Sequence, residues 1–170
     1  MSLTFLLGGA RSGKSTLATE LASGWGGAVA VIATGEARDD EMAERIRAHR
    51  AERPHGWQTV EEPLELHAAL AALPESAAAI VDCLSLWVAN LIERGDDDEQ
   101  VETRSERALG VAEARTSPTI VVSNEVGLGV VPTSPLGRRY RDLLGRVNAQ
   151  WAAAADDAAF VIAGRRLPLQ

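Results

Sequence analysis

Residues 8–15 contain the glycines, lysine and serine that could together hold a chain of phosphates. They match the pattern G-x-x-x-x-G-K-[ST] in full: Gly8, Gly9, Ala10, Arg11, Ser12, Gly13, Lys14 and Ser15. The glycines let backbone N–H groups face the phosphates, and the helix expected next adds its positive N-terminal end. Lys14 is the only lysine of the chain, and its compact ammonium can reach the β- and γ-phosphates as a point charge. Ser15 can place its hydroxyl on Mg²⁺. The pattern therefore predicts a phosphate-binding loop, or P-loop.

An arginine-rich segment, residues 38–53, is predicted to form a helix with a histidine near its end. Asp39 or Asp40 can cap the helix, and Ile46 marks its inner face. His49 follows nearly one turn after Ile46, so we expect it on the same side of the helix.

Two arginines are spaced to act on His49. Arg45 and Arg53 lie four residues before and after it, so we expect them to share its surroundings. Their positive charges disfavour the imidazolium, and neutral imidazole is the nucleophilic form. The same charges would attract a triphosphate, which suits attack by His49 on a nucleotide. The residues alone leave open a plainer interpretation, a histidine at the edge of a helix. His55 is a rival expected in a loop, and His67 is expected on a helix surface.

Two strand ends carry polar side chains that could take part in a reaction. Asp82 directly follows the apolar residues 77–81, where a carboxylate can hold magnesium or its water shell. An ordinary aspartate at a strand end is the alternative. Asn124 and Glu125 follow a second apolar run and open a glycine-rich loop that ends at Pro132. Glu125 could position or deprotonate an acceptor hydroxyl, although a purely structural loop explains these residues equally well.

Five apolar runs predict the strands of a mostly parallel sheet: residues 3–7, 28–33, 77–81, 119–122 and 159–163. They are apolar throughout, as expected for strands covered on both faces. Helical stretches separate them, including residues 15–22 and a long one from Tyr140, and this alternation indicates an α/β fold. The acidic residues 93–106 are expected to form an exposed loop and a helix start. No repeat or second domain is visible, so we expect one nucleotide-binding domain over residues 1–170.

The composition narrows the class of protein. A formal net charge of −7 over 170 residues argues against a general nucleic-acid binder. Cys83 is the lone cysteine, so the chain has neither an internal disulfide nor a cysteine cluster for zinc. The first residues show no basic region or long apolar stretch, so we expect no membrane anchor and a cytoplasmic location.

Four stretches, in this order, make the chain resemble one enzyme family. They are G-G-A-R-S-G-K-S, D-D-E-M-A-E-R-I-x-x-H-R-x-x-R-P, S-N-E-V-G-L-G-V-V-P and R-D-L-L-G-R-V-N. Together they are similar to the bifunctional adenosylcobinamide kinase/adenosylcobinamide-phosphate guanylyltransferase family, over nearly the whole chain. The resemblance implies a P-loop NTPase fold with a RecA-like, mostly parallel sheet and helices on both faces. It also implies a homotrimer, to which we expect Trp87 and Trp151 to contribute as large apolar groups.

The resemblance implies two activities that act in turn on one acceptor. The family phosphorylates the aminopropanol hydroxyl of adenosylcobinamide with ATP or GTP. It then transfers GMP from GTP to adenosylcobinamide phosphate through a guanylyl-histidine, releasing pyrophosphate. The product is adenosylcobinamide-GDP, a late intermediate of cobalamin biosynthesis. The expected ligands are therefore GTP, ATP, Mg²⁺ and the two cobinamide acceptors.

The motif match also assigns roles to residues. The histidine of H-R-x-x-R-P falls on His49 as the catalytic nucleophile, and the arginines fall on Arg50 and Arg53. The positions that resemble further nucleotide-contact segments are Thr34, Gly35, Glu61 and Asp82. Ser15 and Asp82 are the expected magnesium ligands.

Two rival functions stay open at this point. A monofunctional P-loop kinase would use Lys14, Ser15 and Asp82 without a covalent histidine. A nucleotide-driven switch or assembly protein with a RecA-like core would need no small acceptor. Residues 93–117 match no family pattern, and we place no functional residue there.

Overall fold

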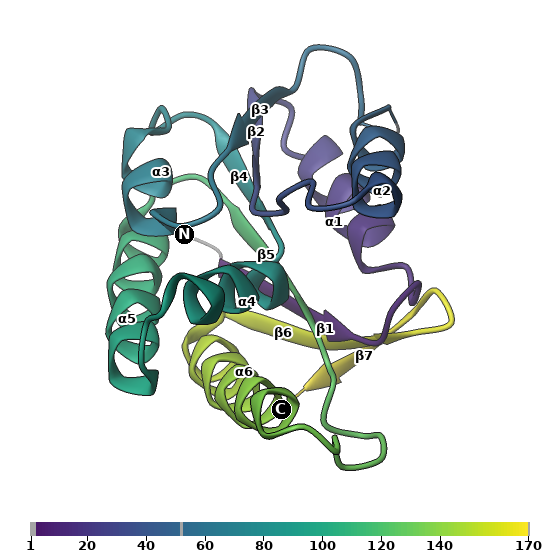
Figure 1. Cartoon of the computed structure of the whole chain (residues 1–170). Coiled ribbons are helices and arrows are strands. Elements are labelled where there is room, and N and C mark those ends of the chain that lie inside the picture. Colours follow the sequence, from purple (N-terminus) through teal and green to yellow (C-terminus); the bar gives the residue numbers. More distant parts are fainter. Residues whose placement is uncertain (1–2, 52, 170) are drawn as a thin grey trace.

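Seven strands form one sheet within residues 3–51 and 53–169, the parts of the chain that the computed structural model describes (Figure 1). The strands are β1 (Leu3–Gly8), β2 (Val29–Ala33), β3 (Gln58–Glu61), β4 (Ala78–Asp82), β5 (Thr119–Asn124), β6 (Asp157–Ile162) and β7 (Arg165–Leu169). Their order across the sheet is β3-β2-β4-β5-β1-β6-β7. Neighbouring strands run parallel, except that β7 pairs antiparallel with β6. The mostly parallel sheet expected from the apolar runs is confirmed.

Helices cover both faces of this sheet. They are α1 (Lys14–Ser23), α2 (Asp40–Ala51), α3 (Leu66–Ala72), α4 (Leu84–Arg94), α5 (Asp98–Ala114) and α6 (Pro135–Ala154). Buried residues of α3 to α6 form one apolar core with strand residues such as Phe5 and Val81. Ala18 and Ala22 of α1 form a second core with residues of the opposite strand faces, such as Val31. The α/β architecture with helices on both faces is therefore confirmed. In the described part of the chain, every helix is too short or too polar to cross a membrane.

The two edge strands were not predicted from the sequence. β3 has four residues and only two of them are half-buried, so it lacks the apolar run that marks the other strands. All five residues of β7 are exposed, and it contains a proline. Proline is tolerated on an edge strand, where its missing N–H need not join a ladder.

The structure confirms one further expectation and corrects another. Residues 93–106 contain the expected exposed loop and helix start, because α4 runs to Arg94, a short loop follows, and α5 begins at Asp98. Asp97 caps α5 by accepting from the Gln100 N–H at 2.8 Å. Trp87 and Trp151 are 1% and 0% exposed, so they fill the core of this chain and offer no surface to another copy.

Candidate active site

The P-loop joins the carboxyl end of β1 to α1 and has the tight geometry that its glycines predict. A Cβ atom on Gly8 would lie 2.3 Å from the backbone oxygen of Val161, so only glycine fits there. Gly13 has a φ of 99°, which side chains rarely allow. The Gly164 N–H donates to the Ser12 carbonyl oxygen at 2.8 Å. The turn between β6 and β7 therefore supports the loop.

Lys14 is folded over the P-loop. It is 6% exposed, and its Nζ donates to the Gly9 carbonyl oxygen at 2.6 Å and to Ser12 Oγ at 3.3 Å. Burial lowers the pKa of Lys14, and the acidic groups of Cys83 and Asp82 act in the opposite direction. A phosphate oxygen in the loop would compete with the Gly9 carbonyl for this ammonium and would bring it a full negative charge.

Asp82 ends β4, and β5 separates that strand end from the P-loop strand. Neighbouring strands lie about 4.8 Å apart, so the ends of β4 and β1 are separated by roughly 10 Å. Burial raises the pKa of Asp82, while the charges of His49, Arg53 and Lys14 act in the opposite direction. The structure therefore brings together, around one carboxylate, residues that the sequence placed in three separate segments.

The side chains beside the P-loop show whether a Mg²⁺ ion could be held there. Ser15 lies half-buried in the first turn of α1. Within the described residues, no group of three His, Cys, Asp or Glu side chains is placed to hold a metal ion. Mg²⁺ does not require one, because it often takes one or two protein oxygens and completes its shell with phosphates and water. Burial disfavours the negative charge of Asp82, and a cation beside it would balance that charge. Asp82 therefore suits such a site together with Ser15.

Thr34 is fully buried and holds the backbone that follows Asp82. Its Oγ1 donates to the Cys83 carbonyl oxygen at 2.7 Å and accepts from the Cys83 N–H at 2.9 Å. Its carbonyl oxygen accepts from Asn90 Nδ2 at 2.7 Å. Thr34 thus positions the end of β4, and its expected contact with a nucleotide stays a prediction.

α2 carries His49 and packs closely through Ile46. A Cβ atom on Gly35 would lie 3.6 Å from Ile46 Cδ1 and 3.3 Å from Leu86 Cδ1. The missing side chain at Gly35 therefore lets α2 approach the first turn of α4. His49 is exposed near the C-terminal end of α2, in the last turn of the helix. His49 lies near enough to Asp82 that a positive charge on its ring would lower the pKa of that carboxyl.

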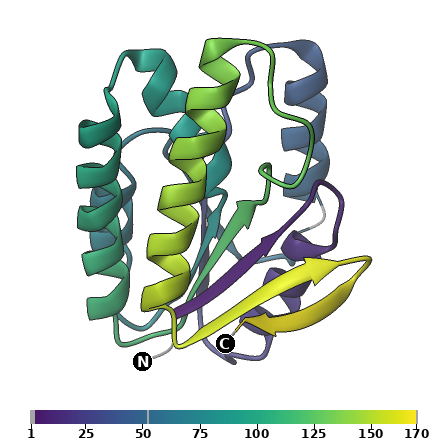
Figure 2. The same ribbon diagram turned by 90° about the horizontal axis from the view of Figure 1, so that it is seen from below.

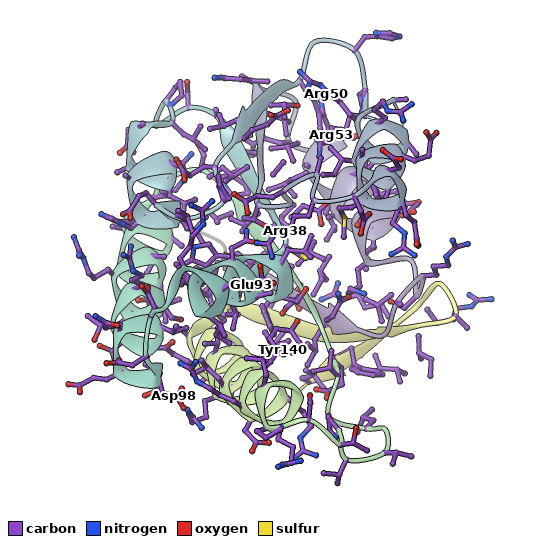
Figure 3. All side chains as sticks on the ribbon, in the orientation of Figure 1. Arg38, Arg50, Arg53, Glu93, Asp98 and Tyr140 are labelled. Atoms are coloured by element: carbon purple, nitrogen blue, oxygen red, sulfur yellow. The ribbon has the colours of Figure 1, made fainter. Side chains whose placement is uncertain are left out.

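Two arginines that follow His49 tie this part of the chain to the edge strand β3 (Figure 3). Arg50 Nη1 donates to Glu61 Oε1 at 3.0 Å, and Arg53 Nη1 donates to Thr59 Oγ1 at 2.9 Å. Burial lowers the pKa of Arg53, and the charge of Asp82 acts in the opposite direction. Arg53 therefore lies between β3 and Asp82.

The sequence also singled out Arg45 as a neighbour of His49 and His55 as a rival to it. Arg45 Nη2 donates to Glu41 Oε1 at 2.7 Å, so its charge is balanced within α2. His55 is exposed in the turn that connects α2 to β3.

No sequence pattern indicated the hydrogen-bond network at the end of β5. Asn124 Nδ2 donates to Ser85 Oγ at 3.0 Å, and the Tyr140 hydroxyl donates to the Ser85 carbonyl oxygen at 3.1 Å. Asn148 Nδ2 donates to the Asn124 carbonyl oxygen at 3.1 Å. Burial raises the pKa of Tyr140 to about 12, so the hydroxyl keeps its proton. The network fixes β5 against α4 and α6, and its members come from separate elements with no common spacing.

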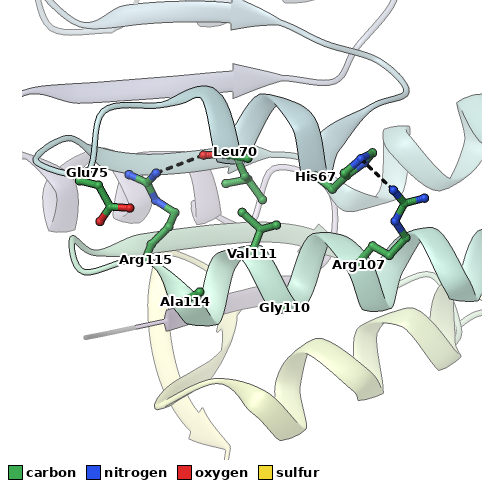
Figure 4. A pocket seen from close by; sticks show the side chains of 9 residues that line it. His67, Leu70, Glu75, Arg107, Gly110, Val111, Ala114 and Arg115 are labelled. Atoms are coloured by element: carbon green, nitrogen blue, oxygen red, sulfur yellow. Dashed lines mark hydrogen bonds between the residues drawn. The ribbon is translucent and has the colours of Figure 1, made fainter.

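A cavity of about 470 Å³ lies between α3 and α5 (Figure 4). His67 Nε2 lies 3.3 Å from Arg107 Nη2 at one end of it, and Arg115 Nη1 donates to the Leu70 carbonyl oxygen at 3.2 Å. None of the described residues that line it is among the nucleotide-site residues expected from the sequence. The cavity is therefore separate from the P-loop site.

Residues 4–169 match the family model described as cobinamide kinase / cobinamide phosphate guanyltransferase. The chain belongs to this family. The bifunctional adenosylcobalamin biosynthesis protein CobP of Pseudomonas aeruginosa is 45% identical over 166 residues, which cover 97% of this chain and 95% of the relative. The bifunctional adenosylcobalamin biosynthesis protein CobU of Escherichia coli is 39% identical over 175 residues, covering 95% of this chain and 96% of the relative. The resemblance drawn from the four motifs is confirmed.

Solved structures similar to this member of the cobinamide kinase family include a recombinase and several ATPases. The RadB recombinase has a TM-score of 0.53 at 16% identity, over 94% of this chain and 73% of that chain. An ATPase of a bacterial type III secretion system has a TM-score of 0.59 at 12% identity, over 94% of this chain and 50% of that chain. At such identities the likeness concerns the fold alone, and the expected RecA-like P-loop fold is confirmed.

Replacing Asp82 by asparagine is expected to stabilise the nucleotide-free protein and to raise the magnesium concentration needed for activity. Burial disfavours the charged carboxylate more than its cationic neighbours favour it. The folded protein therefore keeps the Asp82 proton to a higher pH than the unfolded chain, whose pKa is about 3.9. The free energy of unfolding of the wild type therefore falls as pH rises from the pKa of the unfolded chain through the higher pKa of the folded protein. The asparagine variant has no proton to lose at this position, so its free energy of unfolding does not fall for this reason. A gain of about 1 kcal/mol would raise Tm by about 2–4 °C.

Thermal melts at several pH values check this expectation. The difference in Tm between Asp82→Asn and wild type should vanish near pH 4 and grow toward neutral pH. Asp142→Asn, which changes an exposed aspartate of α6, is the matched control and should show neither effect. An unchanged magnesium requirement in Asp82→Asn would remove Asp82 from the metal site.

Proposed function

We infer that this protein phosphorylates adenosylcobinamide with ATP or GTP and then transfers GMP from GTP to the new phosphate, giving adenosylcobinamide-GDP for cobalamin biosynthesis. The observation that carries this inference is the match of residues 4–169 to the cobinamide kinase / cobinamide phosphate guanyltransferase family. The P-loop with its buried lysine supports the nucleotide part of both reactions.

In the first step the chain positions the triphosphate against the acceptor. Residues 8–15 cradle the phosphates, and Lys14 leaves the Gly9 carbonyl to balance charge on the transferred group. Ser15 and Asp82 would hold Mg²⁺, which would neutralise phosphate charge. The aminopropanol hydroxyl attacks the terminal phosphorus, and the nucleoside diphosphate leaves.

In the second step His49 is the nucleophile. Its exposed position on α2 leaves it accessible to a nucleotide, and the pull of its charge on the Asp82 pKa supports placing it beside the same strand ends. Arg50 and Arg53 would exchange their partners on β3 for phosphate oxygens. Neutral imidazole attacks the α-phosphorus, pyrophosphate leaves, and adenosylcobinamide phosphate then takes GMP from the histidine.

A product assay separates this function from its rivals. Purified protein is incubated with adenosylcobinamide, Mg²⁺ and GTP, and the corrinoids are resolved by chromatography. We expect adenosylcobinamide phosphate first and adenosylcobinamide-GDP later. A reaction that stops at the phosphate would indicate a monofunctional kinase. GTP hydrolysis with no modified corrinoid would indicate a nucleotide-driven switch.

We also expect a homotrimer in the cytoplasm. The family resemblance supports the trimer, and exposed apolar side chains on β6 and β7 supply a surface for it: Ile162, Leu167 and Leu169. Light scattering at micromolar concentration should give three times the chain mass of 18.0 kDa. A constant monomer mass across that range would refute the trimer.

A further inference from the structure

The loop between β5 and α6 exposes more apolar surface than a connection in water should. Val126, Leu128, Val130 and Val131 are 38%, 81%, 96% and 58% exposed. Residues 126–137 contain no charged side chain. We call residues 126–131 the apolar loop. A contiguous run of this kind on a protein surface marks a place where something binds.

Both ends of the apolar loop are fastened. The Glu125 N–H donates to the Gly8 carbonyl oxygen at 3.0 Å, and the Glu125 carboxylate accepts from the Gly127 N–H. Beyond the loop, Arg138 Nη1 donates to the Pro132 and Thr133 carbonyl oxygens at 3.0 and 2.8 Å. The exposed side chains are therefore presented from a segment anchored at each end.

The anchor on Gly8 places the apolar loop next to the phosphates. Gly8 is the first residue of the P-loop, and it pairs with Asn124 at the end of β5. Figure 2 shows the apolar loop and the P-loop on the same edge of the sheet, at the carboxyl ends of β5 and β1. Ligands of open α/β sheets bind at this edge. A molecule resting on the apolar loop would thus be within reach of a nucleotide in the P-loop.

We propose that the apolar loop is the docking surface for the corrin macrocycle of adenosylcobinamide. The proposal rests on the proposed function, which requires a large acceptor to place its hydroxyl at the terminal phosphate. A corrin ring is a broad macrocycle whose rim carries methyl groups beside uncharged amide arms, and its methyl groups can pack on several uncharged aliphatic side chains of such a loop. Leu128 and Val130, the two most exposed, make the central contacts.

Equilibrium dialysis with adenosylcobinamide tests the proposal, because the corrin absorbance reports binding without turnover. Leu128→Ser/Val130→Ser should weaken adenosylcobinamide binding about tenfold or more, since two buried aliphatic contacts are lost. Its affinity for GTP and its covalent labelling from α-labelled GTP should stay within about twofold of wild type, because neither involves the corrinoid. Leu21→Ser, the same change on the far part of α1 at a residue 38% exposed, is the matched control and should bind adenosylcobinamide normally.

Every outcome of the binding experiment either supports or overturns the assignment of the apolar loop to the corrin ring. Equal corrinoid affinity in the double variant and wild type would overturn the proposal, as would a wild-type protein that binds no adenosylcobinamide. A loss of assembly mass in light scattering that accompanies the loss of binding would assign the apolar loop to contact between copies. Wild-type binding without any phosphorylated product would leave the docking surface standing and would instead refute the proposed function.

Discussion

Replacing His49 by alanine should abolish covalent labelling by α-labelled GTP and the formation of adenosylcobinamide-GDP, while adenosylcobinamide phosphate still accumulates. We expect the substitution to remove one activity and spare the other because the two steps depend on different side chains. The kinase step needs the P-loop, whose contacts to Gly164 and Val161 do not involve α2. The guanylyl step needs a nucleophile for the α-phosphorus, and His49 supplies it.

The chemistry of the adduct gives a second check. Attack by an imidazole nitrogen forms a nitrogen–phosphorus bond to GMP and breaks the bond to pyrophosphate. Such a phosphoramidate should survive alkali and break in acid. The label should form from α-labelled GTP and should be absent with γ-labelled GTP, because the γ-phosphate leaves with pyrophosphate.

His55 provides the matched control for this experiment. It is also an exposed histidine, six positions later, in the turn before β3. His55→Ala should keep the label and both products. Full labelling in His49→Ala together with its loss in His55→Ala would move the nucleophile to His55.

Replacing Lys14 by alanine should lower both transfer activities by roughly a hundredfold or more, the scale expected when one preorganised charge is removed from a transition state. Both reactions place a triphosphate in the same loop, so both should fall together. The fold should survive, because the variant removes an ammonium whose charged form burial disfavours. Lys14→Arg should not restore activity, since a planar guanidinium does not match the compact ammonium held 2.6 Å from the Gly9 carbonyl oxygen.

Steady-state assays of both products, with melting curves for each variant, check this expectation. Arg107→Ala removes a cation from the cavity between α3 and α5 and should leave both activities unchanged. Normal turnover and nucleotide affinity in Lys14→Ala would withdraw the P-loop assignment.

The parts of the fold that followed from the sequence are those with strong local patterns. β1, β2, β4 and β5 are buried on both faces and β6 over part of its length, so their apolar runs stand out, and the P-loop is defined by eight consecutive residues. β7 escaped prediction because an exposed edge strand needs no apolar pattern. Trp87 and Trp151 were expected to add to a subunit surface, although both fill the core. Residue type cannot say which side of a helix a tryptophan occupies until the neighbouring helices are placed.

Prediction of the candidate site from the sequence met the same limit, because contacts between separate elements leave no pattern along the chain. Asp82 could be located because it ends a strand, and its neighbours Lys14, Arg53 and His49 come from motifs that are visible in the sequence. The hydrogen bonds that join Ser85 to Asn124 and Tyr140 depend on how α4 and α6 pack against β5, and no spacing along the chain encodes that packing. Thr34 was expected to touch a nucleotide, and its burial against Cys83 became visible only in three dimensions.

The solitary lysine also makes the phosphate site chemically addressable. Lys14 is the one side chain of the sequence that an amine-directed reagent can acylate or reductively methylate. Its burial slows that reaction, and any ligand that draws the ammonium away from the Gly9 carbonyl alters its exposure to reagent. An isotope-labelled methyl group on Lys14 would therefore report occupancy of the P-loop as the one side-chain signal beside that of the N-terminal amine, in a protein whose other fixed side-chain cations are all arginines.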